Sequence, residues 1–199
     1  MALPLSTTGP PDRGAAGRRA RQKAATRARL LAAARVVFAD GSVVTTPLDA
    51  VAAAASVSKA TLFFHFAART ELLEALAGDL YVELYEELTA RPARTTLEFL
   101  TAYLAMQRDD RPRLLWEIGD VLSADGRAVP DVAYRHLRDG LASHLMAGGI
   151  EPGRAARLAG VLGPATFMVA RRVAFGQDRE DEVMRFLADV DHLVGAAHR

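Results

Sequence analysis

The feature that most constrains this chain is the stretch 46–66, which reads as two short helices joined by a tight turn. Thr46-Pro47-Leu48-Asp49 is a compact helix start, because threonine can cap, proline suits the first helical position and an acidic residue can reach back to the cap. Ala55-Ser56-Val57 makes the turn, and Ser58 is a natural cap for the second helix. The stretch therefore predicts a helix-turn-helix.

The remainder of the chain carries helical spacing of apolar residues and no persistent two-residue alternation. A first helix begins at about Thr26 and ends at Asp40-Gly41, where Gly41 can take a left-handed cap conformation. Further helical patterns follow at 70–89, 95–108, 112–123, 130–147, 153–175 and 179–196. We therefore expect an all-α protein of about nine helices.

The pattern at 70–89 contains a leucine at every fourth position: Leu72, Leu76, Leu80, Leu84 and Leu88. Four residues advance 400°, so the row drifts by about 40° per step and its two ends face different neighbours. Such a helix suits a connector between an amino-terminal module and the body. A plain core helix fits the pattern as well.

Charge is unevenly distributed along the chain. Residues 1–69 hold ten Arg and Lys against three Asp and Glu, whereas the remaining residues hold fifteen against twenty-one. A basic amino-terminal third on an acidic body is expected when only that third meets nucleic acid. Residues 1–24 lack apolar periodicity, and we expect them to form a disordered basic arm. The alternative is a solvated charged tail.

The composition excludes several classes of protein. The chain has no cysteine, which rules out disulfides and thiol catalysis and fits a reducing cytoplasm. The longest nearly apolar run, 158–170, is well short of the roughly 20 residues of a membrane span. The amino terminus lacks a signal-peptide core, although its arginine-rich composition resembles a transit peptide. We expect a cytoplasmic bacterial protein without a membrane partner.

The two carboxy-terminal patterns predict self-association. The helix at 153–175 is apolar nearly all round between Arg157 and Arg171, so it must be buried on both sides. The final helix at 179–196 can cover one side and a second copy of the chain the other. We expect a homodimer through a four-helix bundle of these two helices from each subunit.

The segment from Thr26 to about Leu76 resembles the TetR family of bacterial regulators, most clearly over Val57-Ser58-Lys59-Ala60-Thr61-Leu62-Phe63-Phe64-His65-Phe66. The resemblance implies a three-helix DNA-binding domain at 25–69 followed by a helical ligand-binding and dimerisation domain at 70–199. It also implies a regulator of transcription that binds double-stranded DNA.

The residue types of the second short helix favour DNA binding independently of this resemblance. The first residues of a recognition helix meet base edges, where lysine can donate to guanine and small side chains contact a thymine methyl. Similarity to the family places Ser58, Lys59, Ala60 and Thr61 at base-reading positions, Phe64 against base or sugar, and Thr46, His65 and Arg69 at phosphates. Leu62 and Phe66 are expected to pack. Alternatively, Lys59 is merely solvated and His65 covers apolar surface.

Two positions depart from the family pattern. Phe63 stands at a DNA-facing position where the family usually has a tyrosine, so a hydroxyl contact to a phosphate is missing. Ser56 replaces the usual turn glycine, which costs strain if the backbone there is left-handed. The arginines of the amino-terminal arm could compensate by supplying charge that releases counterions.

TetR-like proteins typically enclose a small-molecule pocket in the carboxy-terminal helices. The candidates in this chain are polar, polarisable or aromatic residues on apolar helix faces: Tyr103, Gln107, Trp116, Asp120, His136, His144, Met168 and Arg172. Core and interface packing is the alternative role for each of them. No effector can be identified from these residues.

We expect a ligand-responsive repressor that binds a palindromic operator as a homodimer. An activator or a ligand-independent regulator is the alternative, and a nonspecific architectural DNA binder is a further one. An enzyme using Asp120 and His136 is disfavoured, because no nucleophile elbow, phosphate loop or metal-ligand spacing occurs. We expect no catalytic residues, no cofactor and no metal site.

Overall fold

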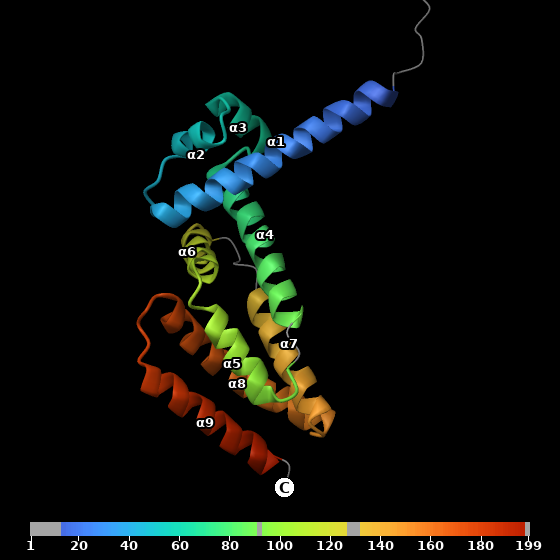
Figure 1. Cartoon of the computed structure of the whole chain (residues 1–199), viewed down its shortest axis with the longest axis vertical. Helices are drawn as coiled ribbons and strands as arrows, with labels where there is room; N and C mark the ends of the chain where they lie inside the picture. The colour runs from blue at the N-terminus through green and yellow to red at the C-terminus, as the bar shows by residue number, and fades with distance from the viewer. Residues whose placement is uncertain (1–12, 91–92, 127–131, 198–199) are drawn as a thin grey trace, which may run out of the picture.

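The structure, a computed structural model, describes residues 13–90, 93–126 and 132–197. Within these residues the chain forms nine α-helices and no strand, which confirms the all-α prediction. The helices are α1 (Arg13–Asp40), α2 (Leu48–Ala54), α3 (Lys59–His65), α4 (Arg69–Ala90), α5 (Thr96–Met106), α6 (Asp110–Ala124), α7 (Val132–Ala147), α8 (Pro152–Ala174) and α9 (Glu180–Ala197). Helices α1–α3 lie at one end of the molecule, and α4 leads from them to the body (Figure 1).

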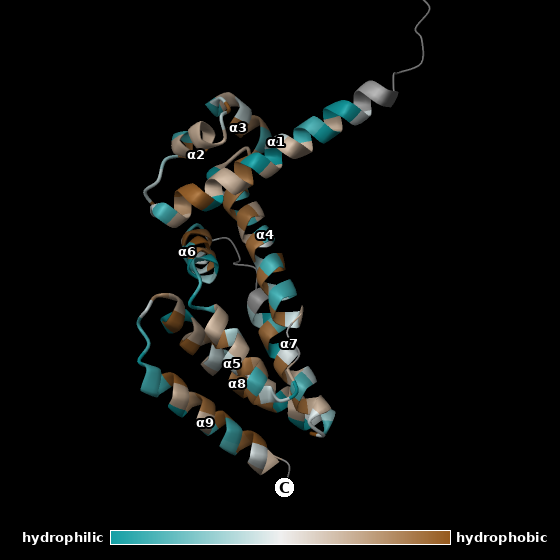
Figure 2. Ribbon diagram, in the orientation of Figure 1, coloured by the Kyte–Doolittle hydropathy of each residue, from teal (hydrophilic) through white to brown (hydrophobic). Residues whose placement is uncertain are grey.

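Helix α1 begins much earlier than the sequence pattern indicated. We expected a disordered arm over 1–24, but residues 13–24 are helical, and residues 1–12 lie outside the described part of the chain. Alanine and arginine are strong helix formers, so these turns can form without an apolar face. The extension projects beyond the rest of the molecule and is largely hydrophilic, whereas the second half of α1 carries most of the apolar side chains of the helix (Figure 2).

A first hydrophobic core joins the amino-terminal helices to two helices of the body. Its buried side chains come from α1, α2, α3, the first half of α4 and, unexpectedly, α6. The contributions of α6 are Leu114, Ile118 and Leu122. The apolar packing therefore continues across the boundary between residues 69 and 70 that we predicted from the sequence.

A second hydrophobic core lies between α5, α7, α8 and α9. Leu88, near the end of α4, packs against this second core, whereas Leu72, Leu76 and Leu80 belong to the first. The winding leucine row of α4 thus contacts both cores, as its 40° drift per step predicts. Helix α4 is the connector between the two ends of the molecule.

Helix α8 is not buried all round within one chain. Ala159, Leu162 and Thr166 are buried, but Val161 is 69% and Met168 61% exposed. The final helix was expected to cover one side of α8 and a second copy of the chain the other, and the apolar side chains of this second side meet solvent in the single subunit. None of the helices within the described ranges is long and apolar enough to cross a membrane.

Candidate functional site

The turn between α2 and α3 has the geometry of a Schellman motif. The amide of Val57 donates to the carbonyl of Ala52 at 3.0 Å, and the amide of Ser56 donates to the carbonyl of Ala53 at 3.0 Å. Ser56 has a φ of +54°, in the left-handed region that favours glycine. The strain expected for serine at this position is therefore present in the turn.

The start of α2 differs from the predicted capping box. Pro47 occupies the N-cap without a side-chain hydrogen bond, and the helix begins at Leu48. Thr46 lies one residue earlier and packs against Gly41, where an added Cβ would come within 2.6 Å of the threonine Oγ1. This close approach, rather than a left-handed cap, explains why residue 41 is a glycine, since its φ is not positive.

The exposed face of α3 carries the predicted base-reading residues. Ser58 caps the helix by accepting a hydrogen bond from the Thr61 amide at 3.0 Å, which fixes the orientation of the first turn. Ser58, Lys59, Ala60, Phe63 and Phe64 are exposed, and Thr61 and His65 are half-buried. Leu62 and Phe66 are completely buried, as expected for packing residues.

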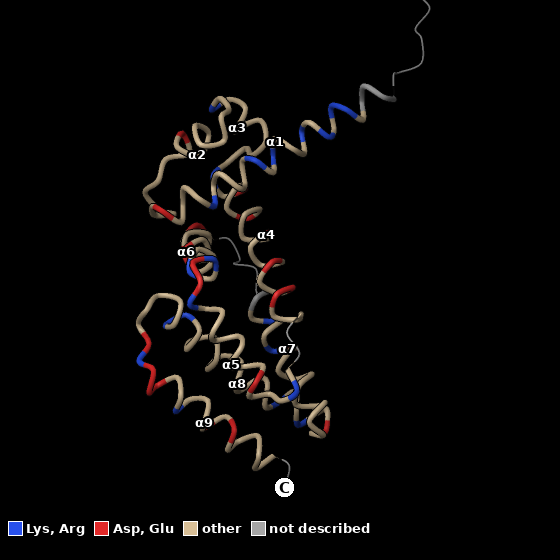
Figure 3. The backbone as a smooth tube through the Cα atoms, in the orientation of Figure 1, with Lys and Arg blue, Asp and Glu red and all other residues tan. Residues whose placement is uncertain are grey.

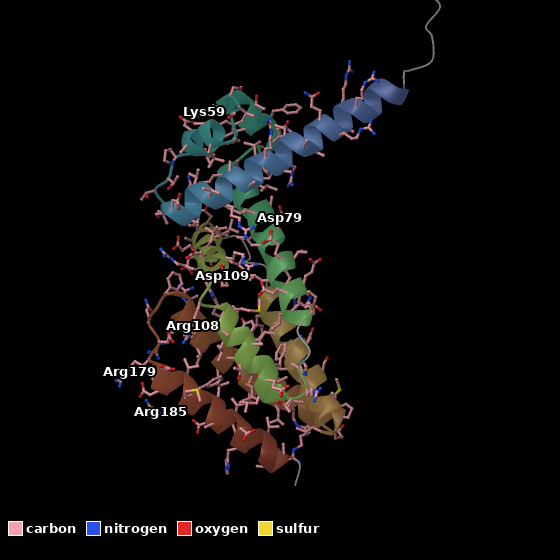
Figure 4. All side chains as sticks on the ribbon, in the orientation of Figure 1. Lys59, Asp79, Arg108, Asp109, Arg179 and Arg185 are labelled. Carbon is pink, nitrogen blue, oxygen red and sulfur yellow. The ribbon has the colours of Figure 1, made fainter. Side chains whose placement is uncertain are left out.

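Lys59 is not simply solvated in the free protein. Its Nζ lies 2.8 Å from Oδ1 of Asp49, on the preceding helix, and both side chains are 61% exposed. Lys59 lies at the outer surface of the α2–α3 pair (Figure 4). Exposed ion pairs of this kind contribute about 0–1 kcal/mol, so DNA can displace the carboxylate at little cost.

Arg69 is an internal anchor as well as a candidate phosphate ligand. Its guanidinium donates to the carbonyl of Thr46 at 2.8 Å and to the carbonyl of Val43, and it lies 5.4 Å from the centre of the Phe38 ring. Desolvation by burial lowers the pKa of Arg69 from its ordinary value. The arginine therefore ties the start of α4 to the loop that precedes α2. The same loop holds Thr46, the other predicted phosphate contact.

Two basic residues of α1 border the recognition helix, and the sequence interpretation missed their role. The Nζ of Lys23 lies 5.2 Å from the centre of the Phe64 ring, and the guanidinium of Arg27 lies 4.9 Å from that of Phe66. Desolvation, followed by the charges of Lys23 and Arg27, lowers the pKa of His65 below its ordinary value. The four-residue spacing of Lys23 and Arg27 was the feature of the sequence that could have revealed this role.

The basic face continues along the extension of α1. Arg19, Lys23 and Arg27 follow one another at four-residue steps, so they share one side of the helix, and all three are exposed. No acidic residue precedes Asp40 in α1. Figure 3 shows this concentration of positive charge along the helix that projects past α3. The row of basic side chains therefore leads from the vicinity of α3 along α1 as far as Arg19.

A large cavity of about 1260 Å³ lies in the body, between α4, α5, α6, α7 and α8. Six of the predicted pocket residues line it, namely Tyr103, Gln107, Trp116, His136, His144 and Met168. Cavities of several hundred Å³ or more with apolar walls and few polar groups are typical of small-molecule sites.

Two predicted pocket residues lie elsewhere. Asp120 accepts two hydrogen bonds from Arg171, at 2.7 and 2.9 Å, and Arg172 forms an ion pair with Glu182 at 2.7 Å. Neither Asp120 nor Arg172 lines the cavity. Both side chains instead form ion pairs between helices, α6 with α8 and α8 with α9, because a charged side chain beside an apolar face is stabilised by an opposite charge.

The polar groups of the cavity wall are held weakly. The Nε1 of Trp116 donates to Oε1 of Gln107 at 3.4 Å, and Nε2 of Gln107 donates to the carbonyl of Tyr103 at 3.3 Å. Burial raises the pKa of Tyr103 above its usual range, which keeps its hydroxyl protonated. Burial also lowers the pKa of His144, whose ring lies 4.6 Å from that of Phe99.

Aromatic rings gather at the α4–α7 side of the cavity. The ring of His136 lies 5.2 Å from that of Tyr81 and 4.7 Å from that of Tyr85. Aromatic pairs at such separations favour stacked or tilted arrangements. Across the described residues, no group of three or more His, Cys, Asp or Glu could hold a metal ion.

The comparisons with known proteins agree with this geometry. Residues 30–76 match the family described as bacterial regulatory proteins, tetR family. A TetR-family transcriptional regulator from Pectobacterium atrosepticum is 25% identical, with a TM-score of 0.69 over 89% of this chain and 96% of that one. No functionally curated protein matches the chain.

Two further solved structures share the fold at lower identity. Salmonella enterica GusR is 20% identical, with a TM-score of 0.60 over 85% of this chain and 95% of that one. A TetR-like transcriptional regulator from Rhodococcus is 23% identical, with a TM-score of 0.52 over 83% and 92%. The helix-turn-helix, the order of the helices and the matched segment lead to one conclusion: residues 30–76 carry the DNA-binding segment of the tetR family of bacterial regulatory proteins, and the chain shares the fold of solved TetR-family transcriptional regulators.

Proposed function

We propose that this protein is a ligand-responsive repressor that binds a palindromic operator as a homodimer. The single observation that carries the DNA-binding part is the exposed first turn of α3, capped by Ser58 and bordered by the basic face of α1. A protein of this kind acts on the chromosome, which places it in the bacterial cytoplasm.

Contacts to bases and contacts to phosphates fall on different residues. The first turn of α3 enters the major groove in proteins of this architecture, so Ser58, Lys59, Ala60 and Thr61 read base edges. Phe63 and Phe64 lie on the exposed side of the same helix and contact sugar or base. Thr46, His65 and Arg69 flank the groove, where they meet phosphates.

The basic face of α1 supplements these contacts. Phosphate neutralisation by arginine and lysine releases counterions and provides most of the affinity that is independent of sequence. Arg19, Lys23 and Arg27 lie along a helix that projects past α3, so they can reach phosphates outside the half-site. This surface offsets the missing hydroxyl at Phe63.

The apolar face of α8 supports the homodimer. Val161 and Met168 lie seven residues apart on one side of α8, and Met184 of α9 is also exposed. Exposed apolar side chains that gather on one part of a surface are typical of an interface. A symmetric pair of recognition helices about 34 Å apart reads two half-sites of a palindrome.

The cavity supports a ligand response because two of the helices that line it also pack against the amino-terminal helices. Tyr81 and Leu84 of α4 and Trp116 of α6 line the cavity. The same two helices supply Leu76, Leu80, Leu114 and Ile118 to the core beneath α1–α3. A ligand that shifts α4 or α6 therefore changes the positions of the recognition helices, and a coupling of about 1–3 kcal/mol changes DNA affinity roughly 5- to 150-fold.

Selection of bound sequences from a random DNA library tests the proposal. A repressor of this kind enriches a palindrome, and Lys59→Ala relaxes the preference at one position of each half-site. A reporter gene placed behind the selected sequence then distinguishes repression from activation. Enrichment without any sequence preference would support a nonspecific architectural protein instead.

A further inference from the structure

The cavity wall has a pronounced charge bias. Among its described lining residues there is no lysine or arginine, and the residues with a full charge are Glu74 and Asp139. The remainder is dominated by aromatic and aliphatic side chains, including Tyr81, Tyr85 and Phe167. A bound molecule meets apolar surface and no fixed positive charge on these walls.

Three arginines that lie close in the sequence to lining residues are paired with carboxylates. Arg138 donates to Asp139 at 2.9 Å, and Arg171 forms a two-point pair with Asp120. Arg111, at the start of α6, forms ion pairs with both Glu87 and Asp109 at 2.7 Å. Each of these cations already has a carboxylate partner, and none of the three arginines lines the cavity.

One patch of the wall can exchange hydrogen bonds with a ligand. The two bonds made by the side chain of Gln107 are long, at 3.3 and 3.4 Å, and the tyrosine hydroxyl of Tyr103 has no partner among the described residues. Tyr103, Gln107 and Trp116 together offer donors and an acceptor without a net charge. A neutral polar group on a ligand fits this patch.

We propose that the cavity selects a largely apolar molecule that carries a neutral hydrogen-bonding group and no negative charge, and that it rejects anions of the same shape. This inference rests on the proposed ligand response, of which it names the ligand class. An anion would lose its hydration and find no counter-charge in the wall, whereas a neutral analogue loses little. Aromatic ligands stack on the rings of α4 and α7.

A matched pair of fluorescent probes tests the proposal on the full chain. N-phenylnaphthylamine is neutral, and anilinonaphthalene sulfonate has the same rings with a sulfonate added. Trp116 is the single tryptophan of the chain and lines the cavity, so quenching of its emission reports binding there. We expect the neutral probe to bind at least about tenfold more tightly than the sulfonate, a difference of about 1.4 kcal/mol.

Two substitutions at one position provide a matched control. Gln107→Arg adds a cation that cannot lose its proton, and Gln107→Met keeps the length without the charge. The arginine variant should bind the sulfonate at least tenfold more tightly than the methionine variant does. If either variant misfolds, the comparison of probes on the unmodified protein still decides.

Equal or tighter binding of the sulfonate by the unmodified protein overturns the ligand class and leaves the ligand response intact. Failure of both probes to quench Trp116 also overturns the class. The proposed ligand response fails separately, if the neutral probe binds in the cavity but no cavity ligand changes the affinity for DNA.

Discussion

Lys59 Nζ lies 2.8 Å from Asp49 Oδ1, so the side chain expected to read a base is paired with a carboxylate of the preceding helix in the free protein. The pair connects the exposed faces of α2 and α3. It also places a negative charge beside the surface that is proposed to meet DNA. Asp49 therefore acts against phosphate binding while it orients the lysine.

We expect Asp49→Asn to raise affinity for DNA severalfold, because the substitution removes a negative charge and frees Lys59 without changing shape. Fluorescence anisotropy with a labelled operator at two salt concentrations measures the effect. The gain should shrink at the higher salt concentration. A loss of affinity would show that Asp49 instead contributes a favourable contact.

Alanine substitutions of Lys59 and Lys23 should weaken DNA binding in different ways. Lys59→Ala should lower discrimination at one base pair by about 1–3 kcal/mol, whereas Lys23→Ala should weaken all sequences about equally and reduce the salt slope by about one. Arg21→Ala is the matched control for Lys23→Ala, since two residues place it about 200° around α1. Similar losses at residues 21 and 23 would contradict a DNA-facing side of α1.

Ser56→Gly should stabilise the fold, because glycine adopts a positive φ without the steric cost of about 1 kcal/mol that serine carries. Urea unfolding gives the change in the free energy of unfolding. Ser56→Ala keeps the steric cost and should show no such gain. Equal stability of the glycine and alanine variants would mean that the turn is not strained.

The pH dependence of stability should include a contribution from His144. Burial lowers its pKa in the folded state, so the unfolded chain takes up a proton first as the pH falls below the ordinary value of 6.5. The stability of the folded state is therefore complete above that pH and declines below it. His144→Gln should lose less stability than the unmodified protein between pH 7.5 and pH 5.5, as measured by urea unfolding. An unchanged pH dependence would rule out this role.

Val161→Arg should disrupt the homodimer, because it places a charge on the apolar face of α8. Val36→Arg is the control, since Val36 is similarly exposed, at 59%, but lies on α1. Sedimentation velocity of both variants at micromolar concentration distinguishes them. A dimer that survives Val161→Arg, or a monomeric unmodified protein, would remove α8 from the interface.

The sequence predicted most of the helices and the burial of Leu62 and Phe66 because both depend on local patterns. Cap residues, the four-residue leucine row and the spacing of Leu62 and Phe66 are all short-range signals. The helical state of residues 13–24 was missed because a helix that projects into solvent needs no apolar stripe. Its basic residues at four-residue spacing were the remaining clue.

Long-range pairing was less accessible to sequence reasoning. Asp120 and Arg172 lie on apolar helices like true pocket residues, and only the fold shows their partners, Arg171 and Glu182. The same is true of Arg69, whose carbonyl partners lie more than twenty residues away along the chain. The place of α6 in the first core is likewise a property of the tertiary packing.

The central claim is that two copies of the chain read one symmetric site. The mass of the complex with a selected DNA site, measured by sedimentation equilibrium, tests it most directly. The account predicts two copies of the chain, or a multiple of two, on a palindrome with half-sites one helical turn apart. A single copy bound to an asymmetric site would contradict it.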